Sequence, residues 1–398
     1  MTGNNEGKKG LKHCAQRPTD WLLLAVPLAF AIDLIPGWKN GVVLFFVAGI
    51  AIIPLAAWLG RATEHLAARA GPAIGGLVNA TFGNAPELIL SLVALSKGLT
   101  VLVKASITGS IIGNILLVLG TAILAGGMRF SHQRFSQTGI RIAATALTLA
   151  VIGLIIPTIF HVTTGGVRDS VSSRGVQNLS VAVAVVLFAT YFLWLIFSLI
   201  THKDLFAGEN SQDNRSASRK NAPWPVAKAL TILVATAILI AIMSEFLAGS
   251  VETTCKNLHL SELFVGVIIV AIIGNASEST AVLVAIKNQM DLALGITIGA
   301  TLQVALFITP VLVFASYLIG PPMTLEFSLP EVAAITLAVG IVVLISGDGE
   351  CNWLEGVQLI AVYVIIALFF YYLPESTSVQ GRAIGKGRDA SLQPGSGH

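Results

Sequence analysis

Two short motifs each place a carboxylate inside a long apolar stretch. Gly83–Glu87 reads Gly-Asn-Ala-Pro-Glu, and Gly274–Glu278 reads Gly-Asn-Ala-Ser-Glu, 191 residues later. An ionisable side chain at membrane depth costs on the order of several kcal/mol and is usually retained for function. A single buried Glu also fits a structural role, but two in matched motifs favour one functional site that is built twice.

The motif residues supply oxygen atoms that suit a hard cation. Each motif offers one carboxylate, one amide and backbone carbonyl groups that are freed where Gly or Pro weakens the helix. The candidate metal ligands are Glu87, Glu278, Asn84, Asn275, Gly83 and Gly274. Calcium takes roughly six to eight such ligands, whereas zinc and copper favour Cys or His, which neither motif contains. The motifs therefore predict a calcium site, in which the two Asn residues act as ligands, as caps of the broken helices, or as both.

The same carboxylates can couple calcium to protons. Two neighbouring carboxylates in a site with little water favour protonation, whereas a divalent cation favours the ionised pair. Calcium and protons then compete for the same oxygens, and a site that crosses the membrane with either ion performs exchange. Calcium is the transported substrate in this interpretation, and no cofactor is expected.

Five polar residues near the motifs are candidates for coupling or for support of the ligands. They are Gln303, Lys104, Ser277, Ser106 and Thr301. Gln303 also fits simple hydrogen bonding between helices. Lys104 lies near the end of an apolar stretch, so its ammonium group also fits a position at the membrane interface.

The composition indicates a polytopic membrane protein. The 398 residues are 55% hydrophobic and only 11% charged, and the mean hydropathy is +0.81. Soluble domains carry about 25% charged residues. The net charge of +3 is small and gives no support for nucleic-acid binding, and the three cysteines are isolated from one another. The histidines form no HExxH motif, so a zinc protease has no support either.

The apolar pattern predicts an all-α fold with eleven transmembrane helices. A spanning helix needs roughly 20 mostly apolar residues. The expected spans are 20–35, 41–60, 77–96, 101–126, 139–160, 179–201, 225–248, 262–286, 291–317, 329–347 and 353–373. The first of these resembles a secretory signal, but Asp33, Pro36 and Gly37 favour a retained helix.

The spans are expected to form two inverted repeats. A polar linker, 202–224, separates residues 41–201 from residues 225–373, and each half has five spans with its motif in the second. Because five is odd, the second half enters the membrane in the opposite orientation, as in many secondary transporters. Gly109 and Gly299 also correspond, 190 residues apart. Residues 1–40 form the N-terminus and first helix, and residues 374–398 form a tail.

The distribution of Lys and Arg predicts the orientation. Fourteen of them fall in the loops on the N-terminal side and eight on the opposite side. Loops rich in Lys and Arg stay in the cytoplasm. The N-terminus is therefore expected in the cytoplasm and the tail outside.

These residues resemble the calcium/proton antiporter family of the cation/calcium exchanger superfamily. The run Asn79–Leu88 is similar to the first repeat of that family, and Gly274–Glu278 is similar to its second. Supporting matches are Lys104–Ser106 through Leu119–Gly120, Thr201–Phe206, Gln303–Phe307 and Asp348–Gly356. The resemblance covers Trp21 to Pro374. It implies eleven helices, calcium export driven by proton entry, Glu87 and Glu278 as the exchanging carboxylates, and glycines that let the motif helices bend.

The chain departs from the family pattern at three places. Ser279 stands where members usually have His, and Lys104 stands where they often have Gln. The linker is less acidic than in many eukaryotic members, which favours a prokaryotic cell membrane over a vacuolar one. The alternatives are a sodium/calcium exchanger of the same superfamily and a cation channel. An enzyme is not expected, and the sequence carries no signal for an oligomeric state.

Overall fold

The computed structural model describes residues 18–70, 72–164, 170–202 and 224–374. The predicted N-terminal segment before residue 18, nearly all of the linker, and all of the tail except residue 374 lie outside these ranges. Within them the secondary structure is helical except for one pair of two-residue strands.

The elements follow one another along the chain in two groups. The first group is η1 (Pro18–Leu24), α1 (Ala25–Leu34), α2 (Gly41–Ala70), α3 (Pro72–Phe82), α4 (Ala85–Ser96), α5 (Thr100–Ile112), η2 (Gly113–Val118), α6 (Leu119–Gly127), β1 (Gln133–Arg134), α7 (Gln137–Thr163), α8 (Ser170–Ile196) and η3 (Phe197–Thr201). The second group is α10 (Val226–Leu258), α11 (Glu262–Phe264), η5 (Val265–Val270), α12 (Ala271–Gly274), η6 (Ser277–Ser279), α13 (Thr280–Ala285), α14 (Met290–Gln303), η7 (Val304–Ile308), α15 (Thr309–Ile319), α16 (Leu329–Ile345), β2 (Glu350–Cys351) and α17 (Trp353–Tyr372).

The helices confirm a polytopic membrane protein, although fewer of them meet a strict length requirement than the eleven predicted spans. Each predicted span coincides with helical structure. Among the described residues, seven helices are long and apolar enough to cross a membrane, or eight if the bent pair Glu262–Gly274 and Ser277–Ala285 is one span. The helices α4 and α16 are apolar but shorter, with 12 and 17 residues.

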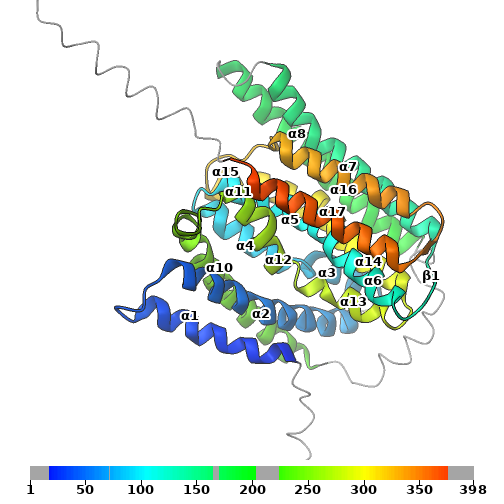
Figure 1. Ribbon diagram of the computed structural model, residues 1–398, viewed down its shortest axis with the longest axis horizontal. Coiled ribbons are helices and arrows are strands. Elements are labelled where there is room, and N and C mark those ends of the chain that lie inside the picture. Colours follow the sequence, from blue (N-terminus) through cyan, green and yellow to red (C-terminus); the bar gives the residue numbers. More distant parts are fainter. Residues whose placement is uncertain (1–17, 71, 165–169, 203–223, 375–398) are drawn as a thin grey trace, which may run out of the picture.

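The helices form two outer layers around a buried middle (Figure 1). On one side α2 packs along α10 with α1 beside them, and on the other side α16 packs on α7, which also contacts α8. Between them lie the short motif helices together with α5, α6 and α14. The most apolar part of Thr100–Gly127 is 83% buried, against 22% for Val226–Leu258. Large apolar side chains cover the outside of the outer helices, as expected for contact with lipid.

A small strand pair joins two loops at one end of the bundle. β1 pairs antiparallel with β2, so that Gln133 lies opposite Cys351. The buried Gln133 amide also donates to the Ala285 carbonyl at the end of α13, at 3.2 Å. These contacts hold the loop after α6, the loop before α17 and the end of the second motif segment together.

Close packing between α6 and α17 depends on glycine. A Cβ atom at Gly356 would lie 2.5 Å from the Leu124 nitrogen and 2.8 Å from the Gly120 carbonyl oxygen. Small residues let spanning helices approach to this distance. The contact holds the C-terminal helix against the middle layer.

Gly356→Leu is expected to destabilise the protein because it forces α6 and α17 apart. Overpacking of this kind costs about 1–3 kcal/mol, and thermal unfolding of the purified protein in detergent measures it. Gly340→Leu is the matched control, since a Cβ there would meet no atom within 4 Å. Equal melting temperatures for the two variants would contradict the close packing of these helices.

Candidate ion site between two broken helices

Both motifs interrupt their helices. α3 ends at Phe82 and α4 begins at Ala85, so Gly83 and Asn84 lie in the break. In the second half α12 ends at Gly274, a single 3₁₀ turn follows, and the two parts of the span are bent by 54°. Pro86 fits the first turn of α4, where a helix lacks a partner for the backbone N–H in any case. The predicted weakening of the helices by the motifs is therefore confirmed.

The breaks bring the two carboxylates into one buried region. Glu87 lies in the first turn of α4 and is 5% exposed; Glu278 lies in the 3₁₀ turn and is 4% exposed. The two side chains interact electrostatically. Glu87 Oε1 lies 3.6 Å from the place that a Cβ atom at Gly274 would occupy. Gly274 thus leaves the space into which the carboxylate of the other motif fits.

The two carboxylates differ in their partners. Glu278 Oε2 accepts a hydrogen bond from the Ser277 hydroxyl at 2.9 Å. Both carboxylate oxygens of Glu87 are buried without a hydrogen-bond partner. Buried polar atoms are nearly always paired, so an unpaired carboxylate is a strong sign that a proton or a cation belongs there.

The Asn residues connect each motif to the other half of the chain. Asn84 Nδ2 donates to the Ala300 carbonyl on α14 at 3.1 Å, and Asn275 Nδ2 donates to the Ser110 carbonyl on α5 at 3.3 Å. Ser110 and Ala300 are 190 residues apart, the offset that also relates Gly109 to Gly299. Each motif Asn therefore donates to the equivalent carbonyl of the other half of the chain. The Asn84 side chain makes no capping hydrogen bond with α4, so the structure favours this bridging role over a cap.

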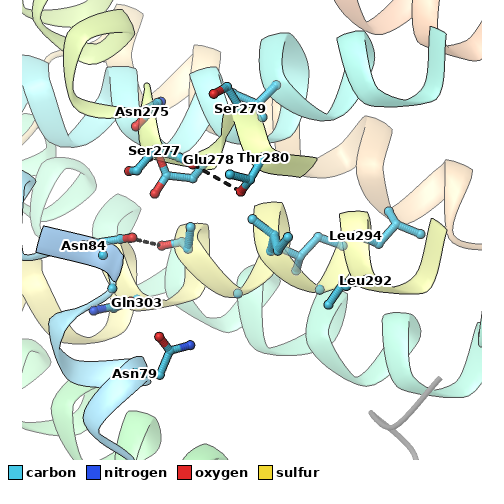
Figure 2. Close-up of a pocket in the computed structure, with 18 of the residues that line it drawn as sticks. Asn79, Asn84, Asn275, Ser277, Glu278, Ser279, Thr280, Leu292, Leu294 and Gln303 are labelled. Atoms are coloured by element: carbon cyan, nitrogen blue, oxygen red, sulfur yellow. Dashed lines mark hydrogen bonds between the residues drawn. The ribbon is translucent and has the colours of Figure 1, made fainter. Parts of the chain in front are cut away.

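Gln303 is held beside the first motif. Its Nε2 donates to the Thr81 carbonyl at 3.2 Å, and its Oε1 lies 3.5 Å from the position of a Cβ at Gly83. Figure 2 shows Asn84 and Gln303 near one end of α14 and Glu278 facing the same helix from the second motif. The glycine at position 113 leaves space for the Asn275 amide, which would lie 2.5 Å from a Cβ there.

A large cavity leads to this region. Its volume is about 1340 Å³, and its wall includes Gly113, Asn275 and Glu278. The wall continues to Glu64 and Ser279, which are exposed, so the cavity opens at that end of the bundle. Arg61 also lines the cavity, and it belongs to the loops that the sequence predicts to be cytoplasmic.

Three of the predicted support residues do not line the cavity. Ser106 is buried in α5, and the Thr301 hydroxyl donates to the Thr297 carbonyl of its own helix at 2.7 Å. Lys104 Nζ donates to the Glu326 carbonyl at 2.6 Å, in the segment between α15 and α16. Lys104 therefore lies toward the end of the bundle opposite the cavity opening.

Asn114 is a candidate ligand that sequence reasoning missed. It is 1% exposed, and neither its Nδ2 nor its Oδ1 has a hydrogen-bond partner. It lies in the π-helical turn η2, and η7 is a second π-helical turn that begins at Val304, the corresponding position of the other half. π-helical turns often occur at functional sites. A comparison of the two halves could not single out Asn114, because its counterpart is apolar.

The donor set is one of oxygen atoms rather than of Cys and His. The described residues contain no group of three or more His, Cys, Asp or Glu side chains that could hold a metal ion. The two carboxylates are supplemented instead by the unpaired oxygens of Asn114 and Asn275. Such a set suits a hard divalent cation that must also leave.

Comparison with known proteins identifies the family. The family model described as sodium/calcium exchanger protein matches residues 40–200 and again residues 228–372, once in each half. The Ca²⁺/H⁺ antiporter of Synechocystis sp. is 45% identical over 365 residues, which are 89% of this chain and 96% of that protein. The Ca²⁺/H⁺ antiporter ChaA of Bacillus subtilis is 42% identical and covers 87% of this chain and 97% of its own length.

A solved structure is also similar to this chain. The structure of native YfkE is 38% identical, covers 89% of this chain and 100% of its own, and has a TM-score of 0.75. The chain is therefore a transporter rather than an enzyme, and it belongs to the calcium/proton antiporter family of the cation/calcium exchanger superfamily.

Proposed function

We propose that this protein exports calcium from the cytoplasm in exchange for protons, by alternating access. The observation that carries the proposal is the meeting of Glu87 and Glu278, from two broken helices, beside a cavity. Relatives with 45% and 42% identity are named as Ca²⁺/H⁺ antiporters, which supports the same pair of ions here.

In the proposed site, calcium binds among oxygen atoms of the two motifs and of η2. The ligands are the carboxylates of Glu87 and Glu278, the side-chain oxygens of Asn275 and Asn114, and carbonyl groups freed at Gly83 and Gly274. Calcium accepts flexible coordination by many oxygen atoms. Magnesium requires nearly octahedral geometry, and structural zinc sites are tetrahedral. Glu87 and Glu278 also lie at the starts of α4 and α13, where the helix dipole favours negative charge.

Protons compete with calcium for the two carboxylates. Without a cation, a buried pair of carboxylates holds a proton more readily than an exposed one does. When calcium binds, it displaces the protons, and when calcium leaves on the other side, protons return. A site with two ionised carboxylates and no bound ion crosses the membrane only at a large electrostatic cost. This cost couples calcium export to proton entry.

The proposed architecture has eleven spans in the cell membrane. Residues 41–201 and 225–373 form two inverted five-helix repeats after a first helix, with the N-terminus in the cytoplasm and the tail outside. The double match of one family model and the reciprocal Asn contacts support the repeats. The bacterial relatives support the cell membrane over a vacuolar one.

A difference between the two repeats supports alternating access. A Cβ atom at Gly109 would overlap the Val267 carbonyl, so α5 and η5 touch backbone to backbone. The offset of 190 residues pairs Gly109 with Gly299, and the motif offset of 191 residues pairs Val267 with Gly76. A Cβ at Gly299 would meet no atom within 4 Å, and both Gly299 and Gly76 line the cavity. The helices α5 and η5 are therefore in close contact, whereas the corresponding surfaces of α14 and α3 face the cavity.

A second pair of positions shows the same difference between the two repeats. A Cβ at Gly266 would lie 2.5 Å from Ala105 Cβ, whereas a Cβ at Gly295, the counterpart of Ala105, would meet no atom within 4 Å. In the opposite state of the cycle, α14 closes on α3 through Gly295 and Gly299, and α5 separates from η5. The cavity then opens on the outer side.

Replacing either carboxylate is expected to abolish exchange. Glu87→Gln and Glu278→Gln each keep the shape of the side chain but remove a charge that binds calcium and protons. The measurement uses acid-loaded proteoliposomes without sodium, to which calcium is added outside while internal pH is followed. Calcium-dependent alkalinisation is expected for the wild type and not for either variant.

Glu252→Gln is the control, because Glu252 is an exposed partner of Lys256 far along α10. It is expected to exchange at the wild-type rate. Wild-type exchange in Glu87→Gln or Glu278→Gln would remove that residue from the site. Calcium entry without proton movement would refute the proposed antiport, and addition of internal sodium would then separate a sodium-driven exchanger from a channel.

Gly299→Leu is expected to hold the cavity open and stop transport, because the added side chain fills the surface that closes on α3. Calcium binding from the cavity side remains. The readout is alkylation of Ser279→Cys at the cavity opening during turnover, in a Cys14→Ser background. The two native cysteines among the described residues are buried, and burial raises the pKa of the Cys351 thiol to about 12, so their background reaction is small.

Labelling of Ser279→Cys is expected to slow when calcium and protons drive the cycle, and to stay fast in Gly299→Leu. Gly340→Leu, which adds the same side chain to the outside of α16, is the control and leaves both transport and labelling unchanged. Wild-type exchange by Gly299→Leu would contradict closure at this surface.

A further inference from the structure

An extended segment with alternate buried side chains lies at the end of the bundle opposite the cavity opening. This outer segment comprises residues 320–328, between α15 and α16. Its alternate side chains Met323, Leu325 and Phe327 are at most 2% exposed. The backbone N–H groups of the same three residues donate to hydroxyls on α15, α8 and α7, at 2.9–3.0 Å. The outer segment is therefore fixed in place on three helices.

A third buried carboxylate lies directly behind the outer segment. Glu331, in the first turn of α16, is 3% exposed. Its Oε2 accepts hydrogen bonds from the backbone N–H and the hydroxyl of Ser328, at 2.8 and 2.7 Å. Its Oε1 accepts from the Thr108 hydroxyl of α5 at 3.3 Å. The carboxylate thus joins the outer segment to the helix that also contacts the ion site.

The charged groups around Glu331 come from three elements. Lys104, one turn before Thr108 on α5, interacts electrostatically with both Glu331 and Glu326. The outer segment supplies Glu326, and α7 supplies His161, whose Nε2 lies 3.3 Å from Glu326 Oε1. Of the other elements in close contact with α16, η2 has no titratable side chain, and α17 has tyrosines and, at its far end, one carboxylate. Lys104 is therefore the candidate counter-charge for Glu331.

Glu331 lies between the helix that contacts the ion site and polar groups at the outer face. Toward the ion site, Thr108 lies two residues from Ser110, whose carbonyl accepts the Asn275 amide. Toward the outer face, Lys104 leads to Glu326 and His161, whose side chains are 30% and 25% exposed. Glu331 is thus the buried carboxylate between the ion site and water on the side where the cavity is closed.

We propose that Glu331 exchanges protons between the outer face and the ion site, with Lys104 as its counter-charge. The inference rests on the proposed calcium/proton exchange and adds a third titrating carboxylate to it. The step is proton transfer alone: a proton from water at the outer face forms an O–H bond with the Glu331 carboxylate, and that bond breaks when Glu87 or Glu278 takes the proton. Glu331 affects calcium only by supplying protons to these two residues. It is not a calcium ligand.

A purely structural role for Glu331 makes a different prediction. Ser328 and Glu331 form a capping box, a reciprocal pair of hydrogen bonds that stabilises the start of α16. Gln serves in a capping box as well as Glu does, but it cannot carry a proton to another group. Glu331→Gln therefore separates the two roles. Glu355→Gln is the matched control, because Glu355 forms the same kind of capping box with Asn352 at the start of α17.

The experiment measures the rate of calcium/proton exchange against pH, with the same pH on both sides of the proteoliposome and with saturating calcium. Glu331→Gln is expected to slow exchange and flatten its pH dependence, at an unchanged melting temperature, while Glu355→Gln keeps the wild-type profile. Thr108→Val leaves the capping box intact and removes only the hydroxyl, and it is expected to slow exchange as well. Wild-type rates and profiles in Glu331→Gln and Thr108→Val would overturn the proposal.

Lys104→Gln tests the counter-charge. A nearby cation favours the ionised carboxylate, so its removal is expected to move the midpoint of the pH profile upward by about one pH unit. In the Glu331→Gln background Lys104→Gln is expected to cause no further shift, because the group on which the lysine acts is gone. A shift of the same size in both backgrounds would overturn the pairing. Absence of any calcium-driven proton movement in the wild type would refute the proposed function itself, which distinguishes the two failures.

Discussion

Two carboxylates buried within spanning helices impose the main constraint on this fold, because such groups cost free energy unless a proton, a cation or a dipole compensates them. Glu87 and Glu278 each lie where a helix restarts after a break, and the helix dipole there favours negative charge. Gly274 provides the space in which the Glu87 side chain fits. The broken helices, the glycines and the reciprocal Asn bridges follow from this requirement.

The pseudo-symmetry of the chain explains how a site made of two equal motifs can face one side at a time. Asn84 and Asn275 make equivalent contacts, so the centre of the site is symmetric. The surfaces around it are not: Gly109 packs against a backbone, whereas Gly299 faces the cavity. In the proposed cycle, an exchange of these two packings carries the site from one side of the membrane to the other and keeps the same ligands.

Local chemistry and hydropathy predict much of this arrangement from sequence. The motifs can be recognised because carboxylates are rare in apolar stretches, and the spans follow from hydropathy. The helix ends do not: α2 runs on to Ala70 and α10 to Leu258, beyond the expected 60 and 248, because polar residues continue the helix past the apolar part. Asn114 has an apolar counterpart, and Glu331 resembles an ordinary cap. The partner of Lys104 lies over 200 residues away, so no local pattern could assign it.

In the proposed exchange, calcium and protons occupy the same two carboxylates. Calorimetric titration of the purified protein with calcium, in buffers that differ in ionisation enthalpy, measures the protons released as calcium binds. We expect release of more than one proton near neutral pH or below, weaker calcium binding as pH falls, and reduced release in Glu87→Gln and Glu278→Gln. Calcium binding that releases no protons and keeps the same affinity across pH would contradict it.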